Sequence, residues 1–294
     1  MRIDPGRDLT EHSVTIKGRR VRTVQAGTGE PLVVFESGLG APAELWVEVQ
    51  RQVSATTATL AYDRAGVGGS KRVKGPRLFA DINADLEAVL TEIRYDGPLI
   101  LVGQSWGGPI VRAFAQQTRR PVAGVVLVDG TNSHAMTTDL GEALSAFFSL
   151  LSLASRIGLH RRWRGKMLKG TTAGLAPEDQ LRVKTGMLRS SAQRGGADEA
   201  KGLVSELDNL AGIEDRGFPA GTPVTFMSAT VAEPGTEETR ERFVARQKAE
   251  AESGGHRHVV VDTSRHDIHM QEPALVADEI LMLVERHRTV TPAG

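Results

Sequence analysis

The stretch Gly103–Gly107, which reads Gly-Gln-Ser-Trp-Gly, is the first part of the sequence whose residues could do chemistry. A serine hydroxyl becomes a useful nucleophile when a neighbouring base takes its proton. In a chain with 32 glycines this spacing alone is a weak signal, so its flanks matter. Leu99–Val102 before it is typical of a buried strand, and Pro109–Gln117 after it is typical of a helix. A serine in a tight strand-to-helix turn favours a nucleophile, Ser105, over a glycine-rich packing turn.

The base for this serine is sought among eight histidines. His266 follows the expected strand His258–Val261 and precedes the expected helix Ala274–Arg288. In a parallel sheet, the loops that follow the strands gather at one edge, so His266 should lie on the same edge as Ser105. His269, three residues further on, is the competing candidate.

The carboxylate that would orient the histidine has two candidates at that edge. Asp129 ends the expected strand Val122–Val128, and Glu233 lies in the loop after the expected strand Pro223–Met227. Asp129 could instead cap an Asp-Gly turn, and Glu233 could be an exposed loop charge. Asp267 is too close to His266 in sequence to orient its ring. We expect Asp129 to be the acid, with Glu233 as the alternative.

Four segments in order resemble the α/β-hydrolase superfamily, in its esterase-like and lipase-like serine hydrolase branch. Besides the serine turn, Phe35–Gly40 resembles the oxyanion loop after the third strand, and Tyr62–Ser70 resembles the family's Asp-x-x-Gly-x-Gly-x-Ser loop. Ser264–His266, with a proline downstream at position 273, resembles the stretch around the catalytic histidine. The resemblance implies an oxyanion hole made by the backbone N–H groups of Leu39 and Trp106.

The chain departs from the family pattern at three places. Ser37 stands where the oxyanion loop usually has histidine, and Arg265 stands where glycine usually precedes the catalytic histidine. The loop Met227–Pro234, where many members carry the acid, contains no aspartate. Other members carry the acid after the sixth strand, where Asp129 lies. Haloalkane dehalogenases and epoxide hydrolases of this fold use an aspartate nucleophile, in contrast to Ser105.

Strand-like and helix-like segments alternate along most of the chain, which predicts an α/β fold. We expect a mostly parallel sheet of about eight strands with helices on both faces. Residues 131–218 contain helical patterns and no convincing strand, which predicts a helical cap inserted after strand 6. The core would then be residues 1–130 and 219–294, with 131–218 as the cap, or lid. The remaining strands are expected at Ser13–Ile16, Arg20–Gln25, Pro31–Glu36, Thr57–Tyr62 and Pro98–Val102, and the remaining helices at Leu78–Ile93 and Glu237–Glu252.

The expected cap holds an apolar group followed by the basic stretch His160–Lys166. We expect a helix packed on the sheet edge, whose apolar side lines an acyl or small hydrophobic pocket. A lipid-facing lid is the alternative. Ala143–Leu159 is interrupted by polar residues too often to span a bilayer. The glycine-rich loop Asp63–Lys71 fails the spacing of a phosphate-binding loop. The apolar group is Phe147, Phe148, Leu150, Leu151, Leu153, Ile157 and Leu159.

Composition excludes several classes of protein. The 294 residues carry 36 basic and 36 acidic side chains, which gives no signal for nucleic-acid binding. The absence of cysteine excludes disulfides, thiolate catalysis and cysteine-bound metals. Met1–Pro5 lacks the apolar run of a secretory signal. We expect a cytoplasmic monomer or homodimer without stable membrane insertion, a cofactor or a metal.

Together these features predict a two-step acyl transfer on a small, hydrophobic ester or lactone substrate, through an acyl-enzyme on Ser105. Other chemistry with the same residues remains open, namely carbon–carbon bond hydrolysis, a perhydrolase reaction or a hydroxynitrile-lyase reaction. A non-catalytic ligand-binding member of the fold is the alternative from a different class.

Overall fold

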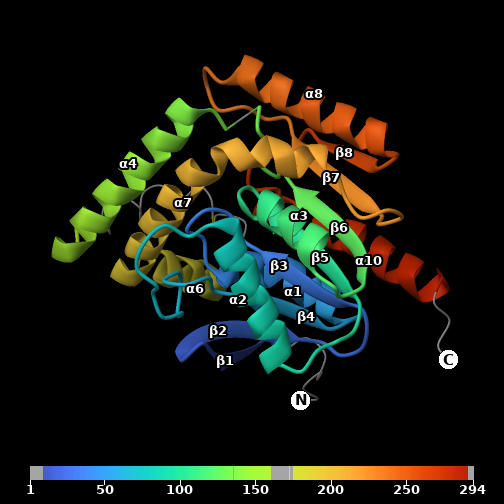
Figure 1. The fold of residues 1–294 in the computed structure, drawn as a ribbon, viewed down its shortest axis with the longest axis horizontal. Coiled ribbons are helices and arrows are strands. Elements are labelled where there is room, and N and C mark those ends of the chain that lie inside the picture. Colours follow the sequence, from blue (N-terminus) through green and yellow to red (C-terminus); the bar gives the residue numbers. More distant parts are fainter. Residues whose placement is uncertain (1–8, 135, 160–171, 173–174, 291–294) are drawn as a thin grey trace.

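The computed structural model describes residues 9–134, 136–159, 172 and 175–290 (Figure 1). The amino-terminal Met1–Pro5, the basic stretch His160–Lys166 and residues 291–294 of the tail lie outside the described residues.

An eight-stranded sheet forms the centre of the molecule, in the order β1-β2-β4-β3-β5-β6-β7-β8. The first hairpin and the β2–β4 pair are antiparallel, and every other neighbouring pair is parallel. The predicted fold class is therefore confirmed. The strands are β1 (Thr10–Ile16), β2 (Arg19–Ala26), β3 (Leu32–Glu36), β4 (Thr59–Tyr62), β5 (Leu99–Gln104), β6 (Val122–Val128), β7 (Val224–Ala229) and β8 (Arg257–Val261).

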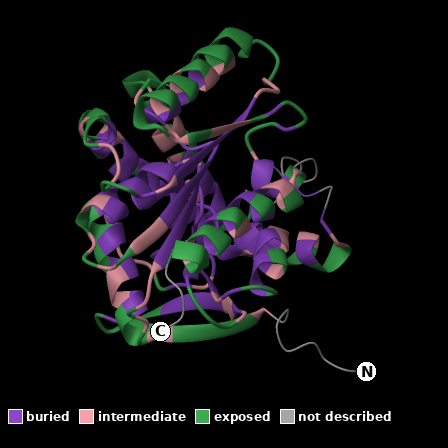
Figure 2. Cartoon of the chain, turned by 90° about the vertical axis from the view of Figure 1, so that its right-hand side faces the viewer, coloured by how far each residue is buried: buried purple, intermediate pink, exposed green. Residues whose placement is uncertain are grey.

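Helices cover both faces of the sheet, as Figure 2 shows by the buried strands between layers with exposed outer surfaces. The side chains of α2 (Phe79–Glu92), α3 (Gly107–Gln117) and α8 (Glu237–Gly254) contribute to the core on one face. Those of α1 (Val47–Ser54) and α10 (Pro273–Val290) contribute to the core on the other face.

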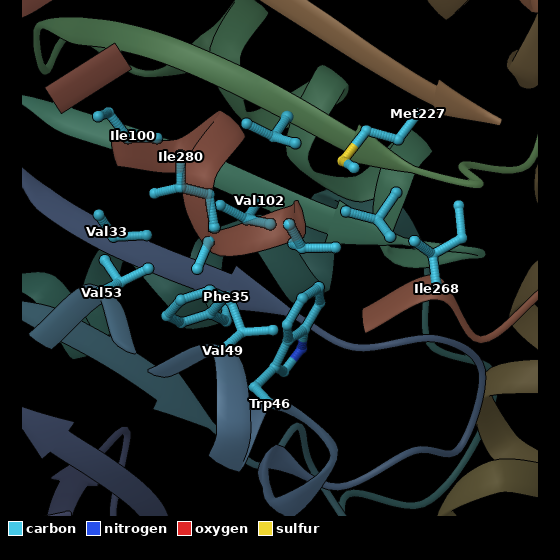
Figure 3. Close-up of a cluster of buried hydrophobic side chains, with 14 of the residues drawn as sticks. Val33, Phe35, Trp46, Val49, Val53, Ile100, Val102, Met227, Ile268 and Ile280 are labelled. Atoms are coloured by element: carbon cyan, nitrogen blue, oxygen red, sulfur yellow. The ribbon is translucent and has the colours of Figure 1, made fainter. Parts of the chain in front are cut away.

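Successive residues of the central strands enter opposite cores. On β3, Val33 and Phe35 join the cluster beneath α1 and α10, while Leu32 and Val34 join the cluster beneath α2 and α3. Figure 3 shows the first of these clusters, where Phe35 lies 5.0 Å from Trp46 between ring centroids. Because both faces are buried, these strands are apolar throughout, which is why continuous apolar runs revealed them in the sequence.

The chain between β6 and β7 forms helices and, among its described residues, no strand. These inserted helices are α4 (Thr138–Ala154), the short 3-10 helix η2 (Ser155–Ile157), α6 (Pro177–Met187) and α7 (Ser190–Asp215). They occupy the stretch in which a cap was predicted; the division of the chain into core and cap stays a prediction.

The stretch Thr138–Ile157 is long and apolar enough to cross a membrane by length and composition alone, with 28% of its most apolar window buried. The overlapping stretch Ala143–Leu159 is predicted from sequence to be too interrupted to do so. Its interruptions are mainly serines, which reduce hydropathy far less than charges do. In the structure α4 packs against α7.

Candidate active site

Ser105 lies in the turn between β5 and α3 and adopts a left-handed backbone with φ of 52°. Two glycines make this turn possible. A Cβ on Gly103 would lie 2.4 Å from the carbonyl oxygen of Gly107, and a Cβ on Gly107 would lie 2.3 Å from that of Glu36. A backbone held in a sparsely populated region is often found at functional sites, because the surrounding structure must impose it.

The structure brings His266 and Asp129 together. His266 Nδ1 lies 2.6 Å from Asp129 Oδ2. Asp129 follows β6 directly, is fully buried, and accepts the backbone N–H of Ala229 at 3.0 Å. The residues flanking His266 connect β8 to the short helix α9 (Ile268–Gln271). These are the loop positions that the sequence predicts for the two side chains.

Glu233, the alternative acid, lies elsewhere on the wall of the same cavity. Its side chain is 65% exposed and its Oε1 is 3.3 Å from Nη1 of Arg265. The structure therefore brings Asp129, and not Glu233, to the imidazole of His266.

His269, the competing base, is fully buried and its ring lies 4.6 Å from that of Trp46. Burial lowers the pKa of His269 to about 3, so its ring stays neutral. His269 is not among the residues that line the cavity at Ser105.

The electrostatic surroundings of His266 favour its charged form. Burial of the ring lowers the pKa of His266, but the hydrogen bond to Asp129 and the negative charge of that carboxylate leave the pKa above its usual value. The side chain keeps 46% of its surface accessible. With Nδ1 directed at Asp129, Nε2 is the ring nitrogen left for proton transfer.

Ser105 and His266 line one cavity of about 720 Å³, together with Asp129. Between these described residues there is no hydrogen bond from the serine hydroxyl to the ring. Such contacts are often long without substrate and shorten when it binds. Much of the cavity wall is apolar and comes largely from the inserted helices; its residues include Leu39, Leu45, Leu140, Leu144, Phe148, Met187 and Leu203.

The apolar cap residues predicted for this wall divide into two groups. Phe148 lines the cavity. Leu151 is buried, while Phe147, Leu150, Leu153, Ile157 and Leu159 are exposed. The sequence predicts a helix with a single apolar side, whereas α4 carries apolar residues on both its cavity side and its outer side.

Two backbone N–H groups beside Ser105 have no hydrogen-bond partner among the described residues: those of Leu39 and Trp106. Gly38 brings the first of them close, because a Cβ there would lie 3.2 Å from the Cβ of Ser105. Trp106 precedes α3, so the positive end of that helix lies at the same place. The arrangement could stabilise negative charge on an oxygen held near Ser105.

The loop that carries Leu39 is held from behind by Arg64. This fully buried guanidinium donates to the carbonyl oxygens of Ser37 and Gly38, each at 2.6 Å. It also pairs with Glu36 on β3 and, at 2.8 Å, with Glu199 on α7. Glu199 in turn accepts the N–H of Gly40 at 2.8 Å. These ion pairs raise the pKa of Arg64 despite its burial, so it stays charged.

Sequence reasoning missed Arg64, Glu199 and Arg240, whose guanidinium contacts Asp129. Arg64 lies inside the Tyr62–Ser70 segment that carries the family resemblance, so a signal for it existed. Nothing in the local sequence distinguishes the other two from surface charges on helices. Among the described residues, no group of three or more histidine, aspartate and glutamate side chains is placed to hold a metal.

Residues 33–279 match the sequence profile of the family described as the alpha/beta hydrolase family. The chain belongs to this family. This α/β hydrolase is 30% identical over 132 residues to an AB hydrolase superfamily protein of Gibberella zeae, a match that covers 42% of this chain and 41% of the relative. It is 27% identical over 125 residues to a soluble epoxide hydrolase of Corynebacterium sp., covering 42% of each chain.

The α/β hydrolase also resembles the solved enol-lactonase of Burkholderia xenovorans LB400, with a TM-score of 0.70 and 16% identity, over 93% of this chain and all of that one. At this identity the likeness shows the fold alone. The chain spans less than half the length of the first curated relatives that it matches. The comparisons therefore show which family the chain belongs to, while its reaction and the bond that it breaks are subjects of a proposal.

Proposed function

We propose that the chain is a serine hydrolase that cleaves a carboxylic ester or a lactone through an acyl-enzyme on Ser105. The observation that carries the proposal is the hydrogen bond between His266 and Asp129 on the wall of the cavity that also contains Ser105. A nucleophile, a base and a group that orients the base are the parts that acyl transfer requires.

In the first step the Oγ of Ser105 attacks the carbonyl carbon, and its proton passes to Nε2 of His266. Asp129 stabilises the imidazolium that forms. The N–H groups of Leu39 and Trp106 bind the oxyanion, and each such donor contributes about 3–4 kcal/mol in well-studied acyl transfer. The imidazolium then gives its proton to the leaving alcohol oxygen as the carbon–oxygen bond breaks.

In the second step a water molecule attacks the acyl-enzyme while His266 takes one of its protons. The tetrahedral intermediate collapses, Ser105 recovers its proton from the imidazolium, and the carboxylic acid leaves. The apolar wall around Leu144 and Phe148 supports a small hydrophobic acyl group as the part of the substrate held there. The solved enol-lactonase and a thermophilic esterase share the fold, which is compatible with this class of substrate.

The test compares Ser105→Ala with Ser253→Ala, an exposed serine on α8 whose hydroxyl donates to the carbonyl of Glu250 at 2.9 Å. Ser105→Ala should reduce kcat on p-nitrophenyl acetate by roughly 10⁶-fold, as loss of a triad nucleophile does elsewhere. Ser253→Ala should match the parent. Parent-level turnover by Ser105→Ala would refute the proposal.

A fluorophosphonate probe separates catalysis from a purely ligand-binding role. We expect one covalent adduct, located on Ser105 by peptide mass analysis and absent from Ser105→Ala. A chain that binds ligands with an inert serine would not be labelled. Product analysis with esters and lactones would then distinguish hydrolysis from carbon–carbon cleavage, perhydrolysis or cyanohydrin cleavage.

A further inference from the structure

Arg240 on α8 contacts the carboxylate that holds His266. Its Nη1 donates to Asp129 Oδ1 at 2.9 Å and to Oδ2 at 2.7 Å. Oδ1 also accepts the N–H of Ala229, and Oδ2 lies against Nδ1 of His266. The fully buried carboxylate of Asp129 is therefore shared between the candidate base and a permanent cation.

Arg240 lies at the cavity wall with 20% of its side chain exposed, and its guanidinium carbon is 4.9 Å from the centre of the Phe243 ring. Asp129 is its sole ion-pair partner among the described residues. The charge of Arg240 is therefore balanced only by the carboxylate that also stabilises a protonated His266.

We propose that Arg240 is a positioning residue that sets the basicity of His266 through their common partner, Asp129. The proposal rests on the function proposed above. A guanidinium that already contacts both oxygens of Asp129 fixes the direction of this carboxylate, so the tautomer of His266 is fixed as well. The same positive charge disfavours a second positive charge on the imidazole.

The other charged groups near His266 act in different senses. Asp129 and Asp267 raise the pKa of His266, while Arg240 lowers it. His269 is neutral, and Arg265 is paired with Glu233. Arg240 is thus the cation that limits the effect of the two aspartates. Without Arg240, His266 would keep its proton to higher pH, and it would be available as a base over a narrower pH range.

The test removes the charge of Arg240 in two ways, by R240Q and by R240M, which keeps more of the apolar stem. R240K retains the charge. R242Q is the matched control, because Arg242 lies on the same helix, is 78% exposed and pairs with Glu238. The ring resonances of His266, assigned with H266N, are followed by NMR as pH changes, and the pH profile of kcat/KM on an ester is measured alongside.

In R240Q and R240M we expect the titration of His266 to move to higher pH, and the acidic limb of kcat/KM to move with it. R240K should stay closer to the parent than R240Q, and R242Q should match the parent. At a pH on the acidic limb, the charge-free variants should lose activity that returns at higher pH. A residue that only supported the fold would not give this reversible shift.

Titrations of R240Q and R240M that stay at the parental position, or move to lower pH, would overturn the proposal. So would an R240K as shifted as R240Q, or loss of folding in both charge-free variants, since Arg240 would then be a structural residue. The NMR titration needs no turnover, so its result is independent of the Ser105 test. If the NMR titration of His266 shifts while the acidic limb of kcat/KM stays in place, His266 is not the base.

Discussion

The inserted helices α4 and α7 pack against each other, but the rest of the molecule holds them very differently (Figure 1). Along α7, buried charged side chains contact other parts of the molecule: Glu199 pairs with Arg64 in the loop after β4, and Glu206 accepts the N–H of Phe79, the first residue of α2, at 2.8 Å. Along α4, Leu150 and Leu153 are more than half exposed. One helix is joined to the sheet by specific polar contacts, while the other presents apolar surface to solvent.

Glycines make the close approach of α7 possible. A Cβ on Gly195 would lie 2.5 Å from the carbonyl carbon of Gly66, and a Cβ on Gly40 would lie 3.1 Å from the Cα of Gly196. Backbone thus packs on backbone at the loop that carries the free N–H of Leu39. These contacts join α7 to the loop that carries Leu39, whereas α4 contributes apolar side chains to the cavity wall.

The largest expected effect comes from separating α7 from the sheet. Gly195→Ala places a methyl group against the backbone of Gly66, which cannot rotate away, so α7 or the loop must shift. We expect a loss of about 3 kcal/mol in the free energy of unfolding, measured by urea denaturation.

The matched control is Gly212→Ala on the same helix, where the nearest atom to the new Cβ is Nη1 of Arg216 at 3.7 Å. Alanine is the better helix former, so this variant should gain up to about 1 kcal/mol. Equal stability of the two variants would show that α7 does not depend on this contact.

An intermediate effect is expected from Glu199→Gln, which keeps the shape of the side chain and removes its charge. Arg64 keeps Glu36 as a partner, so we expect a loss of about 2 kcal/mol, below the full cost of breaking a buried pair. Activity should fall about tenfold in kcat with KM little changed, because the loop with Leu39 is held less firmly. Asp208→Asn, an exposed site on α7, is the control. A change confined to KM would indicate a substrate contact instead.

The smallest effect is expected on the outer side of α4. Leu153 is 59% exposed, so Leu153→Ala should change the free energy of unfolding by less than about 0.5 kcal/mol. Leu151 lies two residues earlier and is 1% exposed, so the control variant Leu151→Ala should lose about 2 kcal/mol in the free energy of unfolding. Thermal denaturation of both variants measures these changes in stability. A large loss of stability in Leu153→Ala would mean that a further surface covers α4.

The central strands of the sheet could be predicted from the sequence because they are apolar along nearly their whole length; the predicted span of β6 agrees with the structure. The helix α1 was missed. Its eight residues carry valines at alternate positions, Val47 and Val49, which favour a strand locally. Packing of this segment against α10 decides its conformation, and such contacts between distant segments leave no local pattern.

The candidate site was predictable where it depends on strand ends. Ser105, Asp129 and His266 each follow a strand, and parallel strands bring their ends to one edge. The choice between Asp129 and Glu233 depends on side-chain direction, which sequence does not give. Arg240 contacts Asp129 and Glu199 contacts Arg64, each from a helix. In both pairs the partners are more than 100 positions apart in sequence.

The contact between Arg64 and the carbonyl of Gly38 has a consequence for the neighbouring residue. In a trans peptide unit the C=O and the following N–H point in opposite directions. By drawing the Gly38 oxygen toward itself, Arg64 turns the Leu39 N–H away, so one peptide plane is oriented from its rear. Arg64 does not line the cavity, yet it orients the N–H of Leu39, which we propose as a donor to the oxyanion. The apolar residues of α4 that line the cavity, Leu140, Leu144 and Phe148, could therefore be changed while that peptide plane is left untouched.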